Sequence, residues 1–286
     1  MKELAGKVAV VTGGASGIGR AMAEGFAAEG MKLVLADVEM DSLQAAKSEL
    51  EDGGAEVLAV RCDVSQADQV SDLAEKTLEA FGKVHVICNN AGVFAGGISW
   101  EAPVSDYEWV LGVNTWGVIH GIRTFVPILL EQGEEGHIVN TASMAGVTSA
   151  AMSAAYYMSK HSVMALSESV FLELQQKEAK IGISVLCPEL INTGIGRSDR
   201  NRPEHLKRPD EGENAERDFV EGVIRQVIPQ GLAPKVMADR VIDAIRENRF
   251  YILSEEGGSW RNACNRRLED IRLGRNPSPE PMTGIN

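Results

Sequence analysis

The sequence predicts an α/β protein with a single doubly wound parallel sheet and helices on both faces. Short apolar segments rich in β-branched residues alternate with longer amphipathic segments along most of the chain. That alternation is typical of repeated βαβ units. The first apolar segment also runs into a glycine-rich loop, and no internal repeat or change of composition divides the pattern. We therefore expect one domain rather than two.

The individual elements follow from this alternation. Strands are expected at the apolar runs 8–12, 32–36, 56–62, 84–88, 137–140 and 181–187. Helices are expected at 17–29, 41–52, 66–81, 105–132 and 153–177. Asp41 at the start of one helical segment and Gly53-Gly54 at its end are ordinary helix start and stop signals. A later helix at 235–248 and a strand at 250–253 would complete the sheet.

Two segments depart from the regular pattern. Residues 194–218 are densely charged and contain several prolines and glycines, so we expect residues 190–230 to form an inserted lid. Residues 256–286 form a C-terminal extension that contains Asn-Pro-Ser-Pro-Glu-Pro and is expected to be poorly ordered unless a neighbouring subunit holds it. The regular domain would then span residues 1–255.

Composition narrows the partners. The chain has 286 residues and a formal net charge of −13. Nucleic acids and anionic membrane surfaces both select basic surfaces, so we expect a small-molecule partner, no nucleic acid and no membrane. The N-terminal segment lacks the apolar core of a secretion signal, and no apolar stretch approaches the roughly 20 residues of a membrane span, which predicts a cytoplasmic protein. The cysteines and histidines show no metal-ligand spacing, so no metal is expected.

The loop after the first strand is a candidate phosphate-binding loop. Its sequence is Thr12-Gly13-Gly14-Ala15-Ser16-Gly17-Ile18-Gly19, and a helix is expected to follow. The glycines allow a tight turn and close approach of a pyrophosphate, which the positive end of the helix attracts. A strand before and a helix after favour this interpretation over an ordinary turn and point to a Rossmann fold. The candidate cofactor contacts are Gly13, Ser16, Gly17, Ile18 and Gly19.

Asp37 follows the second strand and lies 18 residues after Gly19. That spacing is near the one expected of the acid that binds an adenosine ribose hydroxyl. A carboxylate at this position repels a 2′-phosphate, and positions 14–16 and 38–40 hold no lysine or arginine to bind one. NAD is therefore favoured over NADP as the cofactor, although a turn or helix cap also accounts for Asp37.

Two further segments follow neighbouring strands. They supply the candidate cofactor contacts Asp63, Val64, Asn90, Ala91 and Gly92. The carboxyl ends of parallel strands form the edge where open α/β sheets bind ligands. A turn explains Asp63 equally well, and Asn-Asn-Ala-Gly is also a turn signal.

A third set carries the chemistry. Tyr156 and Lys160 are four residues apart in the helix expected at 153–177, so they share a face, and Ser143 lies 13 residues before the tyrosine. A lysine ammonium beside a phenol favours the ionised phenol, so we expect a lowered pKa for Tyr156. Tyr157 points about 100° away around the helix and is paired with His161 instead.

These motifs together resemble the short-chain dehydrogenase/reductase family over about residues 5–255. The resemblance rests on the glycine loop at 12–19, Asn-Asn-Ala-Gly at 89–92, Asn114, Ser143 and Tyr156-x-x-x-Lys160. It implies that Tyr156 is the general base for alcohol oxidation or the general acid for ketone reduction, and that Ser143 donates a hydrogen bond to the substrate oxygen. Lys160 would lower the pKa of Tyr156 and bind the nicotinamide ribose, while Asn114 would hold a water that links Lys160 to solvent.

The resemblance also implies cofactor contacts from Pro188, Ile191 and Thr193. The family usually has Pro-Gly after the sixth strand, whereas this chain has Pro188-Glu189. We expect Glu189 to face solvent, the alternative being that it shapes substrate preference. Pairing of the helices expected at 105–132 and 153–177 between subunits would give a homodimer or homotetramer.

The expected function is transfer of a hydride between NAD(H) and a hydrophobic secondary alcohol or ketone, aromatic ones included. An NADPH-dependent carbonyl reductase, a methyltransferase and a non-catalytic nucleotide-sensing protein are the alternatives. The last two give no reason to keep Tyr156-x-x-x-Lys160. The expected apolar substrate pocket contains Val93, Phe94, Trp100, Met144, Val147 and Met152. Short segments at 201–204 and 258–260 are similar to family members that oxidise benzylic alcohols of aryl ethers.

Overall fold

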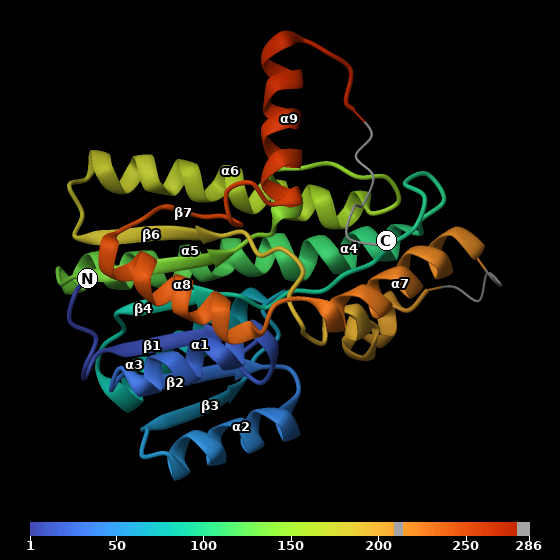
Figure 1. The fold of residues 1–286 in the computed structure, drawn as a ribbon. Helices are drawn as coiled ribbons and strands as arrows, with labels where there is room; N and C mark the ends of the chain where they lie inside the picture. Colours follow the sequence, from blue (N-terminus) through green and yellow to red (C-terminus); the bar gives the residue numbers. More distant parts are fainter. Residues whose placement is uncertain (209–213, 279–286) are drawn as a thin grey trace.

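A computed structural model of the chain describes residues 1–208 and 214–278. Its centre is a seven-stranded parallel sheet with the strand order β3-β2-β1-β4-β5-β6-β7 (Figure 1). The strands are β1 (Val8–Thr12), β2 (Lys32–Asp37), β3 (Val57–Arg61), β4 (Val86–Asn89), β5 (Gly136–Thr141), β6 (Ile181–Leu186) and β7 (Tyr251–Ile252). The expected doubly wound α/β fold is confirmed, with strand ends within two residues of those expected.

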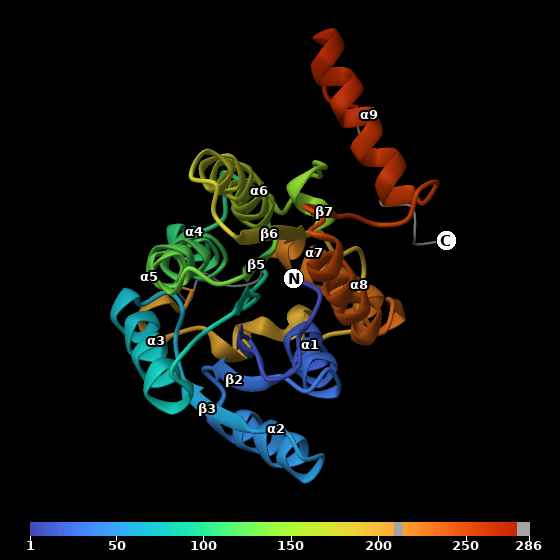
Figure 2. The same cartoon turned by 90° about the vertical axis from the view of Figure 1, so that its left-hand side faces the viewer.

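Helices cover both faces of the sheet (Figure 2). One face carries α1 (Gly17–Ala28), α2 (Met40–Asp52) and α8 (Pro234–Glu247), with Met22 and Phe26 of α1 fully buried in its core. The other face carries α3 (Ala67–Phe81), α5 (Gly117–Gln132) and α6 (Ala154–Gln176), with Phe125 buried there. Strands buried on both faces explain why their sequences are continuously apolar rather than alternating.

The helix expected at 105–132 is interrupted. It consists of α4 (Val104–Leu111), the π-helical turn η1 (Gly112–Trp116) and α5. Asn114 lies in the π-helical turn and is fully buried. Such turns are frequently found at functional sites. Apolar periodicity does not record a change of hydrogen-bond register, so the sequence did not predict it.

The lid segment contains four short helical elements. They are η3 (Ile195–Asn201), η4 (Glu204–Leu206), α7 (Ala215–Val227) and η5 (Ile228–Gln230). The remaining part of the predicted lid, 209–213, lies outside the described residues. A further short helix, η2 (Met144–Gly146), follows β5.

The C-terminal extension differs from the expectation. Residues that were expected to be poorly ordered form α9 (Ser259–Leu273), which stands away from the body of the molecule (Figure 1). Ala263 and Cys264 near its start are buried against the body, whereas Leu268 and Ile271 are exposed. Gly274 ends the helix in the left-handed conformation, with a φ of 63°. The end of the predicted tail, 279–286, lies outside the described residues.

Candidate active site

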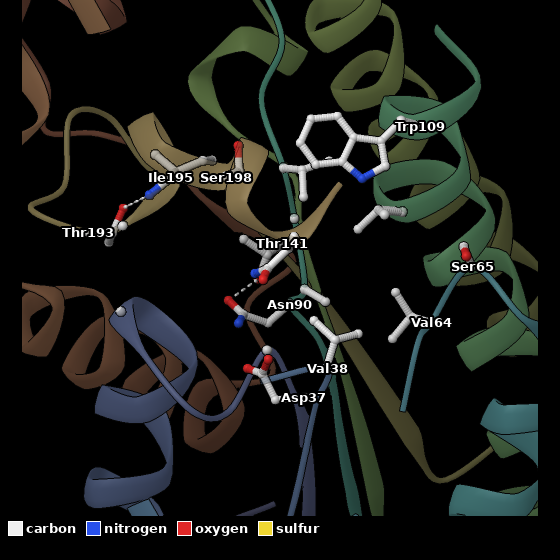
Figure 3. A pocket seen from close by; sticks show the side chains of 18 of the residues that line it. Asp37, Val38, Val64, Ser65, Asn90, Trp109, Thr141, Thr193, Ile195 and Ser198 are labelled. Atoms are coloured by element: carbon white, nitrogen blue, oxygen red, sulfur yellow. Dashed lines mark hydrogen bonds between the residues drawn. The ribbon is translucent and has the colours of Figure 1, made fainter. Parts of the chain in front are cut away.

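A cleft of about 400 Å³ lies at the carboxyl ends of the strands. It is centred on β1 and β4, where the chain order of the sheet reverses. This reversal is where open α/β sheets bind ligands. Figure 3 shows side chains from the ends of β2, β4 and β5 on one side of the cleft, with Val64 and Trp109 opposite.

The glycine loop has no room for side chains at its key positions. Gly13 and Gly17 have φ values of 64° and 56°, in the region that favours glycine. A Cβ at Gly13 would lie 2.9 Å from the Cα of Ala91, and a Cβ at Gly19 would lie 2.1 Å from the carbonyl oxygen of Gly13. Gly14 N–H donates to the Ala36 carbonyl and Ala15 N–H to Asp37, so the N–H groups left for an anion are those of the first turn of α1, which is where a pyrophosphate would bind.

Hydrogen bonds join the loop to the neighbouring strands. The backbone N–H groups of Asn90 and Ala91 donate to Thr12 Oγ1 over 2.9 and 3.1 Å. Asn90 Nδ2 donates to the Thr12 carbonyl over 2.9 Å, and Thr141 Oγ1 donates to Asn90 Oδ1 over 3.2 Å (Figure 3). The ends of β1, β4 and β5 are thus held as one rigid floor.

Asp37 accepts two backbone hydrogen bonds at the end of β2. Ala15 N–H donates to its Oδ2 and Glu39 N–H donates to its Oδ1, each with a donor–acceptor distance of 3.1 Å. Burial raises the pKa of Asp37, and these hydrogen bonds oppose the rise. The residue therefore shapes the glycine loop as well as facing the cleft.

Glu39 connects this end of the cleft to the lid. Arg200 Nη2 lies 2.6 Å and Asn201 Nδ2 lies 2.7 Å from Glu39 Oε1. Burial alone would raise the pKa of Glu39, but the hydrogen bonds from Asn201 and Arg200 lower it. The prediction that no cation lies near Asp37 used only positions 14–16 and 38–40. It therefore did not include Arg200, which lies near Asp37 only in the folded chain.

Asp63 and Val64 also line the cleft. Ser65 donates to Asp63 Oδ1 from its backbone N–H over 3.0 Å and from its hydroxyl over 2.7 Å. One carboxylate oxygen of Asp63 is thus used in a turn. From the sequence, a turn and a cofactor contact were equally good explanations of Asp63. The structure allows both, because Asp63 forms a turn and also lines the cleft.

The candidate reaction centre lies where α6 faces the end of β5. Lys160 Nζ lies 5.6 Å from the ring centre of Tyr156 and donates to the carbonyl oxygen of Thr141 over 3.0 Å. The Tyr156 ring packs edge-on against Phe94 with a centroid distance of 5.2 Å. Ser143 accepts from Ala145 N–H over 3.1 Å, which fixes its hydroxyl near the phenol of Tyr156. Tyr156 and Lys160 therefore lie on the same face of α6, as the sequence predicted.

The predicted lowering of the pKa of Tyr156 is wrong for this structure. Burial raises the pKa of Tyr156 to about 12, although the hydrogen bond with Ser143 opposes the rise. Burial also lowers the pKa of Lys160 to about 8. Removing both groups from water favours their neutral forms, and this effect exceeds the attraction that the i, i+4 spacing suggested.

Asn114 supports the centre from behind. Its Oδ1 accepts from Val93 N–H over 2.8 Å, while its Nδ2 donates to the Val93 carbonyl over 2.9 Å and to Ser159 Oγ over 3.0 Å. Both amide hydrogens thus have protein partners, and Asn114 is not among the residues that line the cleft. A Cβ on Gly92 would lie 3.4 Å from Asn114 Oδ1 and 3.5 Å from Lys160 Nζ, so the two side chains meet beside this glycine.

The segment after β6 forms the far wall. Pro188, Ile191 and Thr193 line the cleft, and Ile195 N–H donates to Thr193 Oγ1 over 3.4 Å (Figure 3). Glu189 does not simply face solvent as expected. Its side chain is only 19% exposed, and its Oε1 lies 3.5 Å from Arg240 Nη1.

A second cavity of about 230 Å³ opens next to the reaction centre. Most of its walls are apolar and come from Phe94 and Leu190, from Ile224 and Val227 of α7, and from Trp260 of α9. Of the pocket residues expected from the sequence, Phe94 lines this cavity and Val93 lines the larger cleft.

The other expected pocket residues lie elsewhere. Trp100 is 84% exposed, and Met144 is fully buried in the core. Val147 packs against that core. Neither Val147 nor Met152 is among the residues that line either cavity. The wall from α7 lies within the lid expected at 190–230, whereas the wall from α9 was not expected, since α9 lies far from the other wall residues along the chain.

The lid is anchored by buried charges. Asp106 of α4 lies 2.8 Å from Arg202 Nη1 and 2.9 Å from Arg208 Nε, and Arg208 Nη2 lies 2.6 Å from Glu221 of α7. The Arg202 guanidinium also stacks on Trp109 at 4.1 Å. A segment that the sequence presented as a charged lid is thus partly folded into the body.

Most site residues proposed from the sequence come together. Those that line the cleft are Gly13, Ser16, Gly17, Ile18, Asp37, Asp63, Val64, Asn90, Ala91, Gly92, Ser143, Tyr156, Lys160, Pro188, Ile191 and Thr193. Gly19 and Asn114 contact this set without lining the cleft. Within the described residues, no group of three or more potential ligands could hold a metal ion. In the same part of the chain, no helix has the length and apolarity to cross a membrane.

Comparison with known proteins gives consistent similarities. A family profile described as short chain dehydrogenase matches residues 7–204. The chain is 32% identical to the CLA biosynthesis dehydrogenase/reductase of Lactiplantibacillus plantarum over 287 residues, with full coverage of both chains. It is also 32% identical to the C alpha-dehydrogenase of Sphingobium sp. strain SYK-6, covering 88% of this chain and 82% of that one.

A solved structure shares the whole fold. The short chain dehydrogenase/reductase from Burkholderia phymatum in complex with NAD is 45% identical, with a TM-score of 0.95 and coverage of 99% of this chain and 100% of that one. The similarity extends beyond the residues that the family profile matches. It therefore includes the lid and the C-terminal extension.

Proposed function

The chain belongs to the short-chain dehydrogenase/reductase family, and we propose that this oxidoreductase transfers a hydride between NAD(H) and a hydrophobic secondary alcohol or ketone. The observation that carries the proposal is the position of Tyr156 and Ser143, which line both the large cleft and the apolar cavity. A group bound in the cleft and a substrate in the cavity would meet at these two hydroxyls.

NAD fits the cleft by its glycine cradle. Gly13 and Gly17 line the cleft and have positive φ values, so the backbone there turns tightly and carries no side chain in the way of a pyrophosphate. Asp37 would bind the adenosine ribose, and Pro188, Ile191 and Thr193 would contact the nicotinamide end. NAD would supply or accept the hydride. The NAD complex of the Burkholderia phymatum relative supports this choice.

The residues of the reaction centre would divide the proton chemistry. Tyr156 would take the proton from the alcohol during oxidation and return it to the ketone oxygen during reduction. Ser143 would donate a hydrogen bond to the same oxygen as negative charge develops on it. Lys160 would bind the ribose and favour the phenolate. Asn114 would hold a water that links Lys160 to solvent, and its hydrogen bonds would keep the 89–93 segment and α6 in register.

The apolar cavity supports a bulky hydrophobic substrate. Its volume of about 230 Å³ lies just below the usual range of ligand pockets, and its aromatic walls suit a ring. The relative named C alpha-dehydrogenase supports inclusion of aromatic alcohols. We also propose that residues 1–255 form the dinucleotide-binding and catalytic domain.

Replacement of Tyr156 tests the mechanism. Tyr156→Phe should lower kcat by about 10²- to 10⁴-fold, the usual contribution of a general acid or base, and leave the Kd of NADH within about twofold. Tyr157→Phe is the matched control, since Tyr157 is the next residue on α6 and points to Thr148 instead. It should retain most activity. Turnover is measured from NADH absorbance. A wild-type rate in Tyr156→Phe would refute the assignment of Tyr156 as the general acid or base.

Coenzyme preference tests the choice of NAD. We expect NADH to bind at least tenfold more tightly than NADPH, because the Asp37 carboxylate would repel a 2′-phosphate and Glu39 engages the nearby Arg200. Asp37→Asn should narrow that preference, and Asp63→Asn, a control in the same cleft, should not. Tighter binding of NADPH by the wild type, measured by fluorescence titration, would favour the carbonyl reductase alternative.

A further inference from the structure

Six residues line both cavities and so mark the junction between them. They are Ser143, Tyr156, Pro188, Glu189, Ile195 and Ile228. Glu189 is the charged member of this set. A hydride that passes between a bound nicotinamide and a substrate must cross this junction, so Glu189 stands beside the place where the charge of the nicotinamide changes.

The Glu189 carboxylate is held on one side only. Its Oε1 lies 3.5 Å from Arg240 Nη1 of α8, a separation longer than a hydrogen bond. Arg240 turns its other nitrogen, Nη2, to the exposed Glu255 at 3.1 Å. Within residues 1–208 and 214–278, no hydrogen bond reaches either oxygen of Glu189. Its negative charge is therefore only partly compensated.

The nicotinamide ring carries a positive charge when oxidised and none when reduced. A fixed carboxylate near the ring attracts the oxidised form alone, and the attraction is stronger in a partly buried site than in water. The arginine behind the carboxylate acts in the opposite sense because it repels the oxidised ring.

Resting on the proposed function, we infer that Glu189 and Arg240 set the relative affinity of this enzyme for oxidised and reduced nicotinamide. Glu189 favours the oxidised form, and Arg240 limits that preference. Tight binding of the oxidised product makes hydride transfer from NADH to a ketone more favourable on the enzyme. The pair therefore biases the bound equilibrium toward ketone reduction.

The test measures the Kd of NAD⁺ and of NADH for the full-length protein, by calorimetry and fluorescence titration. Glu189→Gln removes the charge and keeps the shape, and it should weaken NAD⁺ relative to NADH by about 3- to 10-fold. Arg240→Met frees the carboxylate and should shift the ratio of the two Kd values in the opposite direction, by about 2- to 5-fold. Glu255→Gln, which changes the other partner of Arg240, should leave the ratio within twofold.

Opposite shifts in the two variants support the inference, because a loss of packing would weaken both forms of the cofactor together. An unchanged ratio in Glu189→Gln, or equal weakening of NAD⁺ and NADH in both variants, would overturn it. If the wild type prefers the 2′-phosphorylated cofactors, the same ratio is measured with those. Failure of the wild type to bind any nicotinamide cofactor refutes the proposed function as well, whereas normal binding with an unchanged ratio refutes the role of Glu189 alone.

Discussion

Tyr156 and Lys160 occupy surroundings that favour their neutral forms. The pKa of Tyr156 is raised to about 12 and that of Lys160 is lowered to about 8, in each case by burial. The i, i+4 spacing established that the two side chains are neighbours, but their protonation depends on how much water surrounds them. The protonation of the two side chains therefore depends on how they pack in the folded protein and cannot be predicted from their spacing in the sequence.

These directions predict the pH dependence of the reaction. The pKa of Tyr156 lies above the working pH, so the fraction of Tyr156 that is ionised grows as pH rises. Alcohol oxidation, which uses the ionised phenol as the base, should therefore accelerate between about pH 7 and 10. Ketone reduction uses the protonated phenol, which is already abundant, so it should not accelerate over that range. Initial rates at saturating cofactor and substrate, measured in both directions, check this.

Lys160→Met gives the matching variant. A positive charge beside the phenol favours its ionised form, but Lys160 is protonated mainly below its pKa of about 8, so Lys160→Met should slow alcohol oxidation near pH 7 and change it little near pH 10. A profile that coincides with that of the wild type would mean that Lys160 acts on the cofactor alone. The Kd of NADH, recorded for the same variant, separates that role.

At the scale of elements, α9 changes the view of the C-terminal extension. The sequence predicted a poorly ordered tail over residues 256–286, whereas residues 259–273 form a helix. Trp260, Ala263 and Cys264 nevertheless share one face, and a glycine follows the helix at Gly274. That spacing and stop signal could have predicted α9. Its docking beside the substrate cavity could not have been predicted from them.

Trp260 tests the role of α9 in substrate binding. It lines the apolar cavity and not the cofactor cleft, so Trp260→Ala should raise KM for bulky hydrophobic alcohols by about tenfold, equivalent to about 1.4 kcal/mol. The Kd of NADH should not change. Leu268→Ala on the exposed part of the same helix is the control and should leave both quantities unchanged. An unaltered KM in Trp260→Ala would remove α9 from the substrate site.

The lid shows the same limit of local sequence. Residues 200–208 contain four basic side chains, yet Arg202 and Arg208 pair with Asp106 and Glu221 below the surface. Their acidic partners lie on α4 and α7. Charge composition identified an insertion, whereas the fold determined that part of it is anchored.

At the scale of the whole molecule, the sheet order places the chemistry. Reversal of the chain between β1 and β4 brings the glycine loop, the end of β4 and α6 to one edge. Exposed apolar side chains remain on the helices that the resemblance assigns to subunit pairing, including Trp116, Met158 and Leu172. Such side chains would be covered in the homodimer or homotetramer that the resemblance implies.

The sequence by itself determined the alternation of strands and helices, the glycine positions and the shared face of Tyr156 and Lys160. Those features depend on backbone conformation and on periodicity over a few residues, so the local sequence records them. Only the tertiary structure decided that Arg200 meets Glu39, that Arg240 lies beside Glu189 and that Trp260 lines the apolar cavity. Each pairing joins segments that are remote in the chain, so no local pattern in the sequence records it. The packing of the folded chain, rather than the local sequence, brings these residues together.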